Sequence, residues 1–120
     1  MKVYIACPYT KGDIAQNVHN AIKVADMIAE MGHIPYVPVL AHFWHLVSPH
    51  PWEFWMKIDE EFLKVCDCVF RMDGESTGAD REVELARLSS KPIFYNLGDL
   101  EDIDKFIPKV RAKFSISGEL

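Results

Sequence analysis

Short apolar segments alternate along this chain with longer segments whose apolar residues recur at helical spacing. A chain that passes repeatedly from strand to helix to strand builds a parallel sheet with helices on both faces. The predicted strands are Lys2–Ala6, Ile34–Val39, Asp67–Arg71 and Pro92–Tyr95. Pro35 and Pro38 shorten the second strand or place it at a sheet edge, because proline has no N–H to give to a neighbouring strand.

The helical segments are marked by their periodicity and by residues that favour helix ends. The first is the most regular, and Gly32 ends it. Pro51 suits the first residue of the second helix, and Pro108 breaks or kinks the last one. The predicted helices are Ile14–Met31, Pro51–Val65, Gly78–Ser89 and Leu100–Lys113. The expected buried stripe of the second helix is Trp55, Ile58, Phe62 and Val65, and the segments expected to be irregular are Leu40–His50, Met72–Thr77 and the turn Asn96–Asp99.

This order of elements predicts one domain over residues 1–120, since domains commonly have about 100–150 residues. We expect an α/β, flavodoxin- or Rossmann-like three-layer sandwich with a parallel sheet of four to five strands. Ligands of such sheets bind at the carboxyl ends of the strands, near the point where the strand order reverses. The segments expected there are Cys7–Asp13, the His- and Trp-rich stretch Leu40–His50, and Asp73–Gly78.

Charge and composition exclude several classes of protein. A net charge of −5 and a pI of about 5.5 argue against a nucleic-acid polymer as partner, but they allow a small anionic ligand. No apolar run is long enough to span a membrane, and the first residues lack the pattern of a signal peptide. Cys7, Cys66 and Cys68 are odd in number and are expected to be free thiols, so we predict a cytoplasmic protein.

Glu82 is the carboxylate that the helical pattern turns inward. Its neighbours one turn later are Leu85 and Ala86, whereas Asp80 and Glu84 project to other sides. The helix start just before it, with Ser76 or Thr77 as cap and Gly78 allowing close approach, can hold an anion. The alternative is an ordinary capped surface helix, but an inward acid near an anion site predicts a functional group.

A second inward acid, Asp59, lies one turn after Trp55 and one turn before Phe62. It is either half of a carboxylate pair with Glu82 or an acid at the margin of the stripe with a lysine partner. Tyr4, in the first strand, is either a hydrogen-bond donor to Glu82 or a core aromatic residue. Paired carboxylates suit chemistry at an anomeric carbon, where one attacks and the other moves a proton or orients the sugar.

Three motifs give the chain a resemblance to the nucleoside 2-deoxyribosyltransferase superfamily, which includes deoxynucleoside 5′-monophosphate N-glycosidases and small phage and bacterial relatives. The motifs are Val3-Tyr4-Ile5-Ala6-Cys7-Pro8-Tyr9, then Trp55 to Asp59 with Cys66-Asp67, and Ser76-x-Gly78-x-x-x-Glu82-x-x-x-Ala86. The resemblance covers about residues 2–97. It implies cleavage of the N-glycosidic bond of a 2′-deoxynucleoside or its 5′-monophosphate, by an enzyme that forms a homodimer or a larger homo-oligomer. No cofactor is expected, because the sequence contains neither a dinucleotide-binding fingerprint nor a P-loop.

The resemblance also implies roles for single residues. Glu82 matches the nucleophile that forms a covalent glycosyl intermediate, Asp59 the acid near base and sugar, and Tyr4 the tyrosine that positions the nucleophile. Ser76 and Gly78 match the pair that holds the 5′-phosphate, where transferases specific for nucleosides tend to have an aspartate in place of the serine. The residues expected to bind substrate are Ala6, Cys7, Pro8, Tyr9, Trp55, Asp73, Ser76 and Gly78.

The chain departs from the superfamily pattern at three places. The first loop, which follows Ala6, has no arginine for a phosphate, and Glu84 replaces a frequent glycine. Over Lys105–Leu120 the asparagine motif that reaches a neighbouring subunit is not evident. Transfer to another base and hydrolysis share the intermediate at Glu82 and both stay open, as does the choice between nucleoside and monophosphate.

The sequence also allows two other functions for the chain, and its histidines have possible roles of their own. A non-catalytic nucleotide-binding or sensing module is the alternative function, and a flavodoxin-like electron carrier is a weaker one. The stretch with His42, His45 and His50 has Glu53 as its nearest carboxylate and fits no recurring metal-ligand pattern. Packing, or an aromatic wall beside a base, is expected there, and no metal.

Overall fold

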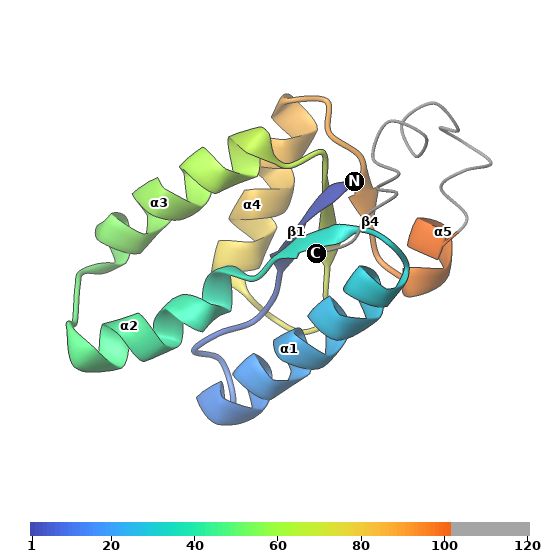
Figure 1. Cartoon of the computed structure of the whole chain (residues 1–120). Coiled ribbons are helices and arrows are strands. Elements are labelled where there is room, and N and C mark those ends of the chain that lie inside the picture. The colour runs from blue at the N-terminus through green and yellow to red at the C-terminus, as the bar shows by residue number, and fades with distance from the viewer. Residues whose placement is uncertain (102–120) are drawn as a thin grey trace, which may run out of the picture.

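The computed structural model describes residues 1–101, which form a four-stranded parallel sheet with helices on both faces (Figure 1). The strands are β1 (Lys2–Ala6), β2 (Ile34–Tyr36), β3 (Cys68–Arg71) and β4 (Ile93–Phe94), in the order β2-β1-β3-β4. The predicted three-layer α/β sandwich with a parallel sheet is therefore confirmed. The predictions of a helix that continues beyond Glu101 and of a break or kink at Pro108 lie outside the described residues.

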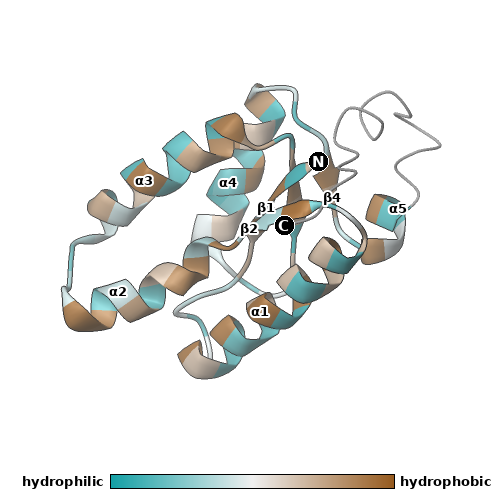
Figure 2. Cartoon of the chain, in the orientation of Figure 1, coloured by the Kyte–Doolittle hydropathy of each residue, from teal (hydrophilic) through white to brown (hydrophobic). Residues whose placement is uncertain are grey.

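Alternation of side chains along the central strand β1 builds the two halves of the core. Val3 and Ile5 face one side, where they pack with residues of α1 (Ile14–Glu30) and α5 (Leu97–Glu101). Tyr4 and Ala6 face the other side, towards α3 (Trp52–Val65) and α4 (Thr77–Leu88). Figure 2 shows both hydrophobic and hydrophilic residues along each of these helices, as expected for helices that cover a sheet with one side only.

Two segments predicted to be irregular are helical, which corrects the sequence analysis. The stretch Leu40–His50 contains a short 3₁₀ turn, η1 (Pro38–Leu40), followed by helix α2 (Ala41–Val47). The apolar residues of α2 point largely to the surface, so no inward stripe marked it as a helix. The predicted turn Asn96–Asp99 is the start of α5, because the Asn96 side-chain oxygen accepts the Asp99 backbone N–H at 3.0 Å and caps the helix.

The buried face of α3 also differs from the prediction. Phe62 and Val65 are 46% and 59% exposed, whereas Met56 and Leu63 are buried. The helix is thus rotated so that Asp59, between Met56 and Leu63, lies on its inner face rather than at the margin. Pro51 precedes the helix as its N-cap instead of being its first residue.

The second strand and the cysteines follow the expectations more closely. β2 is an edge strand and ends at Tyr36, because Pro38 begins the 3₁₀ turn. The three cysteines are buried free thiols. Among residues 1–101, no helix has the length and apolar character needed to cross a bilayer.

Candidate active site

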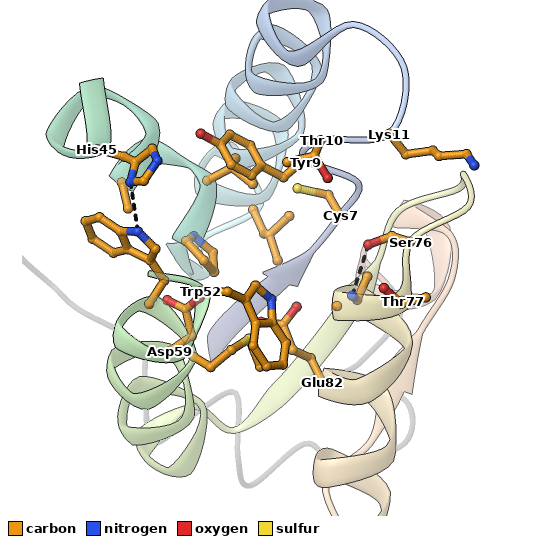
Figure 3. Close-up of a pocket in the computed structure, with 18 of the residues that line it drawn as sticks. Cys7, Tyr9, Thr10, Lys11, His45, Trp52, Asp59, Ser76, Thr77 and Glu82 are labelled. Atoms are coloured by element: carbon orange, nitrogen blue, oxygen red, sulfur yellow. Dashed lines mark hydrogen bonds between the residues drawn. The ribbon is translucent and has the colours of Figure 1, made fainter. Parts of the chain in front are cut away.

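A cavity of about 540 Å³ opens at the carboxyl ends of β1 and β3 (Figure 3). The chain leaves β1 towards β2 on one side and returns to β3 on the other, so the cavity lies at the switch point where ligands of such sheets bind. All three segments predicted to meet there contribute side chains to it. Its volume suits a small organic molecule.

Glu82 is brought into this cavity by helix α4. Ala79, Val83 and Ala86 pack the helix against the sheet, and Glu82, between two of them, is buried with 8% of its surface exposed. The fully buried Tyr4 hydroxyl donates a hydrogen bond to Glu82 Oε2. Within residues 1–101, Glu82 Oε1 accepts no hydrogen bond, so one carboxyl oxygen is held and the other faces the cavity free of protein donors.

Two of the three acids that line the cavity, Glu82 and Asp59, have raised pKa values. Burial raises the pKa of Glu82 to about 8 and that of Asp59 to about 6, because removal from water disfavours the charged form. The Tyr4 hydroxyl acts against this at Glu82, since a donor favours the carboxylate. Within the described chain no lysine pairs with Asp59. The structure thus brings Glu82 and Asp59 to one cavity as an acid pair with pKa values above their ordinary range.

The start of α4 forms a second wall. Ser76 Oγ accepts the Ala79 backbone N–H at 3.1 Å, so it caps the helix and keeps its own hydroxyl hydrogen for another acceptor. Of the atoms in residues 1–101, a Cβ atom built at Gly78 would meet only Ser76 Oγ, at 4.0 Å, so this part of the chain leaves space for a ligand in front of Gly78. At Gly74, by contrast, a Cβ would lie 2.7 Å from Pro8 Cγ, so this loop requires glycine to pack against the first loop.

The loop after β1 brings a cation to the cavity. The Asn17 side-chain amide donates to the carbonyl oxygens of Tyr9, at 2.9 Å, and Lys11, at 2.8 Å, which holds the loop on the start of α1. Lys11 Nζ lies 3.7 Å from Glu75 Oε2, and both residues line the cavity. In Figure 3, Lys11 is on the same side of the cavity as Ser76. Burial raises the pKa of the Cys7 thiol to about 12, so Cys7 is a neutral wall rather than a nucleophile.

An aromatic wall closes the opposite side. His45 Nδ1 accepts hydrogen bonds from Trp55 Nε1, at 3.0 Å, and from the His50 backbone N–H, at 3.2 Å, which ties α2 to α3. Trp52 lies at the start of α3 with the Arg81 guanidinium 5.4 Å from its ring centre. Among residues 1–101, no group of three His, Cys, Asp or Glu side chains is arranged to hold a metal ion.

The predicted site residues divide into those that line the cavity and those that do not. Four of the predicted residues do not line it. Tyr4 is bonded to Glu82 and acts through it, and Ala6 is buried beneath α4. Pro8 packs on Gly74, and Asp73 is exposed. The predicted residues that line the cavity are Cys7, Tyr9, Trp55, Asp59, Ser76, Gly78 and Glu82. Other residues also line the cavity. An aromatic wall was one of the two roles expected for the stretch with His45 and His50, and Thr77 was a possible cap of the helix start, whereas Thr10, Lys11, Met56 and Glu75 had no expected role. Their neighbourhood was the only available signal, since most lie in the three segments expected at the strand ends.

Comparison with known proteins identifies a family and a fold. A family model described as "Domain of unknown function (DUF7768)" matches residues 1–96. The solved structure of a 2-deoxyribosyltransferase from the psychrotolerant bacterium Bacillus psychrosaccharolyticus is similar, with a TM-score of 0.63 and 100% of each chain covered. That enzyme is described as a biocatalyst for the synthesis of antiviral and antitumoral nucleosides. The two sequences are 19% identical, so the similarity concerns the fold. No curated protein matches the sequence.

Proposed function

This chain belongs to the family described as Domain of unknown function (DUF7768), and we propose that it cleaves the N-glycosidic bond of a 2′-deoxynucleoside or its 5′-monophosphate. The observation that carries the proposal is the Glu82 carboxyl group, buried beside the cavity with one oxygen held by Tyr4 and the other free. The fold that it shares with a 2-deoxyribosyltransferase supports the same reaction class. No cofactor takes part in the proposed reaction, and we propose a cytoplasmic location.

In the first proposed step, the ionised form of Glu82, which the Tyr4 hydrogen bond favours and burial disfavours, attacks C1′ of the sugar through Oε1 while the bond from C1′ to the base nitrogen breaks. Activity should therefore rise as pH approaches about 8 and Glu82 loses its proton. The positive charge that develops on the sugar is stabilised by the adjacent carboxylate, which the Tyr4 hydroxyl keeps in place. The departing base takes up the electron pair of the broken bond. Asp59 supplies a proton to it, and a pKa of about 6 leaves part of Asp59 protonated near neutral pH, as a general acid requires.

In the second step, a nucleophile opens the glycosyl ester at C1′ and returns the carboxylate of Glu82. With water, Asp59 accepts the proton that water loses, and the product is the free sugar or sugar phosphate. With another base, a ring nitrogen of that base becomes bonded to C1′, Asp59 accepts the proton that the nitrogen loses, and the reaction is a transfer. Both outcomes use the same residues of this chain.

The test is base release from a panel of deoxynucleosides and their 5′-monophosphates, followed by chromatography with and without an acceptor base. Release of free base supports the proposal, and its dependence on the acceptor separates transfer from hydrolysis. The alternative, a module that binds nucleotides without chemistry, predicts binding with no release from any member of the panel. That result would overturn the proposed reaction.

Ser76 is expected to favour a phosphorylated substrate. Among residues 1–101 no acceptor takes its hydroxyl hydrogen, which can donate to a phosphate oxygen, and Gly78 leaves room for that oxygen. Lys11 lies at the same end of the cavity, where Glu75, with Oε2 3.7 Å from Lys11 Nζ, offsets part of its charge. A hydrogen bond to a charged group contributes about 1.5–3 kcal/mol, and about 1.4 kcal/mol is tenfold in affinity. We therefore expect kcat/KM for a 5′-monophosphate to exceed that for its nucleoside by at least about tenfold.

Ser76→Asp is expected to narrow or reverse this preference, because a carboxylate repels phosphate while it still caps the helix. Ser76→Thr is the matched control, since it keeps both the hydroxyl group and the cap. The measurement is kcat/KM for a 5′-monophosphate and for its nucleoside, with the wild type and with each variant. Equal values for nucleoside and monophosphate that do not change in Ser76→Asp would reduce the helix start to an ordinary cap.

We also propose that the protein assembles with a second copy of itself through α2. The outward side chains of this helix are apolar and at least about half exposed: Phe43 at 55%, Trp44 at 49%, Leu46 at 64% and Val47 at 86%. Burial of such a patch stabilises association by about 25 cal/mol per Å² of apolar surface. Sedimentation at micromolar concentration should show a dimer or larger species, and Leu46→Glu should dissociate it. A fully active wild-type monomer would contradict the proposal.

A further inference from the structure

His45 is held in one tautomer at the end of the cavity opposite Ser76. Its Nδ1 atom accepts hydrogen bonds from two groups that can only donate, the Trp55 indole N–H at 3.0 Å and the His50 backbone N–H at 3.2 Å. The hydrogen of the neutral ring is therefore on Nε2. Within residues 1–101, Nε2 has no hydrogen-bond partner, and the ring lines the cavity.

The order of groups along the cavity gives this N–H a place relative to a substrate. In Figure 3, Ser76 and Lys11 lie at one side, His45 at the other, and Glu82 and Asp59 between them. With C1′ at Glu82 and the 5′ end of the sugar towards Ser76, the base extends past Asp59 towards His45. The edge that reaches His45 is the one farthest from the glycosidic bond, which carries an oxo or an amino group.

We propose that His45 selects bases that present an oxo group at this distal edge over bases that present an amino group. The inference rests on the proposed function and adds its substrate class: 6-oxopurines and 4-oxopyrimidines. An oxo group accepts the hydrogen bond from Nε2–H. An amino group points one of its own hydrogens at the Nε2 hydrogen, so the Nε2–H donor stays unpaired in a partly buried site. A site built to pair a polar group discriminates strongly against a ligand that leaves this group unpaired.

Trp55 is a positioning residue in this arrangement. Without the indole N–H, His45 Nδ1 keeps only the longer bond to the His50 backbone, and the tautomer with hydrogen on Nδ1 becomes accessible. Nε2 then accepts as well as donates. Trp55→Phe should therefore weaken discrimination between the two kinds of base while the ring that lines the cavity is retained.

The experiment measures binding of hypoxanthine and adenine, as free bases, to the full chain, and base release from deoxyinosine and deoxyadenosine and their 5′-monophosphates. Wild type should bind hypoxanthine at least about tenfold more tightly. His45→Phe, which keeps an aromatic ring without a donor, should lose that factor on hypoxanthine and change adenine affinity by about twofold at most. His45→Gln, whose amide both donates and accepts, should bring the two affinities together. His19→Phe, at an exposed position on α1, is the control and should match wild type.

Binding separates this inference from the proposed reaction, because free bases need no bond cleavage. Preference for hypoxanthine with no base release from any substrate supports the role of His45 and overturns the glycosidic chemistry. Base release with equal affinity for the two bases, unchanged in His45→Phe and Trp55→Phe, overturns the role of His45 alone. Absence of binding by either base at millimolar concentration also overturns it. Unchanged circular dichroism of each variant is required, since α2 and α3 are joined through this ring.

Discussion

Replacing Glu82 with glutamine is expected to lower the rate of base release by several orders of magnitude, about 10⁴- to 10⁶-fold, the range seen when one member of a catalytic group is removed. The amide matches the carboxyl group in shape but cannot attack C1′ to form an ester, and it carries no negative charge for the developing positive charge on the sugar. No other carboxyl group of α4 can replace it, because Asp80 and Glu84 are exposed, whereas Glu82 is buried and accepts a hydrogen bond from Tyr4. The measurement is kcat with saturating substrate.

Glu84→Gln is the matched control, one exposed carboxylate on the same helix changed in the same way. It should keep activity within about threefold, since exposed substitutions change little. Affinity for a nucleotide should survive in Glu82→Gln, because the cavity walls remain. Near-normal turnover in Glu82→Gln would remove Glu82 from the mechanism and leave the nucleotide-binding module as the better account.

The free energy of unfolding should respond to pH in a way that reports Glu82 directly. A carboxyl group whose pKa rises from 4.5 to about 8 on folding contributes stability that is fully present below about pH 4.5 and is lost as pH rises through about 8. Each pKa unit corresponds to 1.36 kcal/mol, so the loss is on the order of 5 kcal/mol across this window. Glutamine stays neutral, and Glu82→Gln should not show this loss.

Urea unfolding at several pH values measures the effect as the difference between wild type and variant. Near pH 4.5 the two proteins should have similar stability, and near pH 8.5 Glu82→Gln should be the more stable one. Asp59, with a pKa of about 6, also lowers the free energy of unfolding as pH rises, by a smaller amount. This loss occurs in both proteins and cancels in the difference between them. Parallel curves for wild type and Glu82→Gln would mean that the Glu82 carboxyl is not desolvated as the structure describes. Glu84→Gln should run parallel to wild type.

The inward direction of Glu82 was predictable because it depends on one helix. On α4, side chains three and four positions apart share a face whatever surrounds the helix, so a mostly polar segment with few apolar residues has one unambiguous buried side. The strand positions were predictable for a similar reason. Each is a short apolar segment bounded by residues that favour turns, and the alternation with helices permits few topologies.

Helix α3 had no such unambiguous side. Its aromatic and aliphatic residues are spread around the helix, so several stripes satisfy the pattern, and the one chosen, through Trp55 and Phe62, was rotated from the one that packs. Only contact with β1 and α4 decides that Met56 and Leu63 are buried and that Asp59 faces the cavity. Phe62 is half exposed and stacks instead on Tyr36 of the edge strand, with ring centres 4.5 Å apart.

Local periodicity and chain connectivity are enough to predict the parallel α/β order, the position of the cavity at the strand ends and the inward face of α4. The tertiary structure alone decided the existence of α2, the rotation of α3 and the tautomer of His45. These depend on contacts between residues of different elements, as between His45 and Trp55, and no repeating pattern within either segment encodes them. A hydrogen bond across two helices exists only when packing has brought both of them to the same cavity.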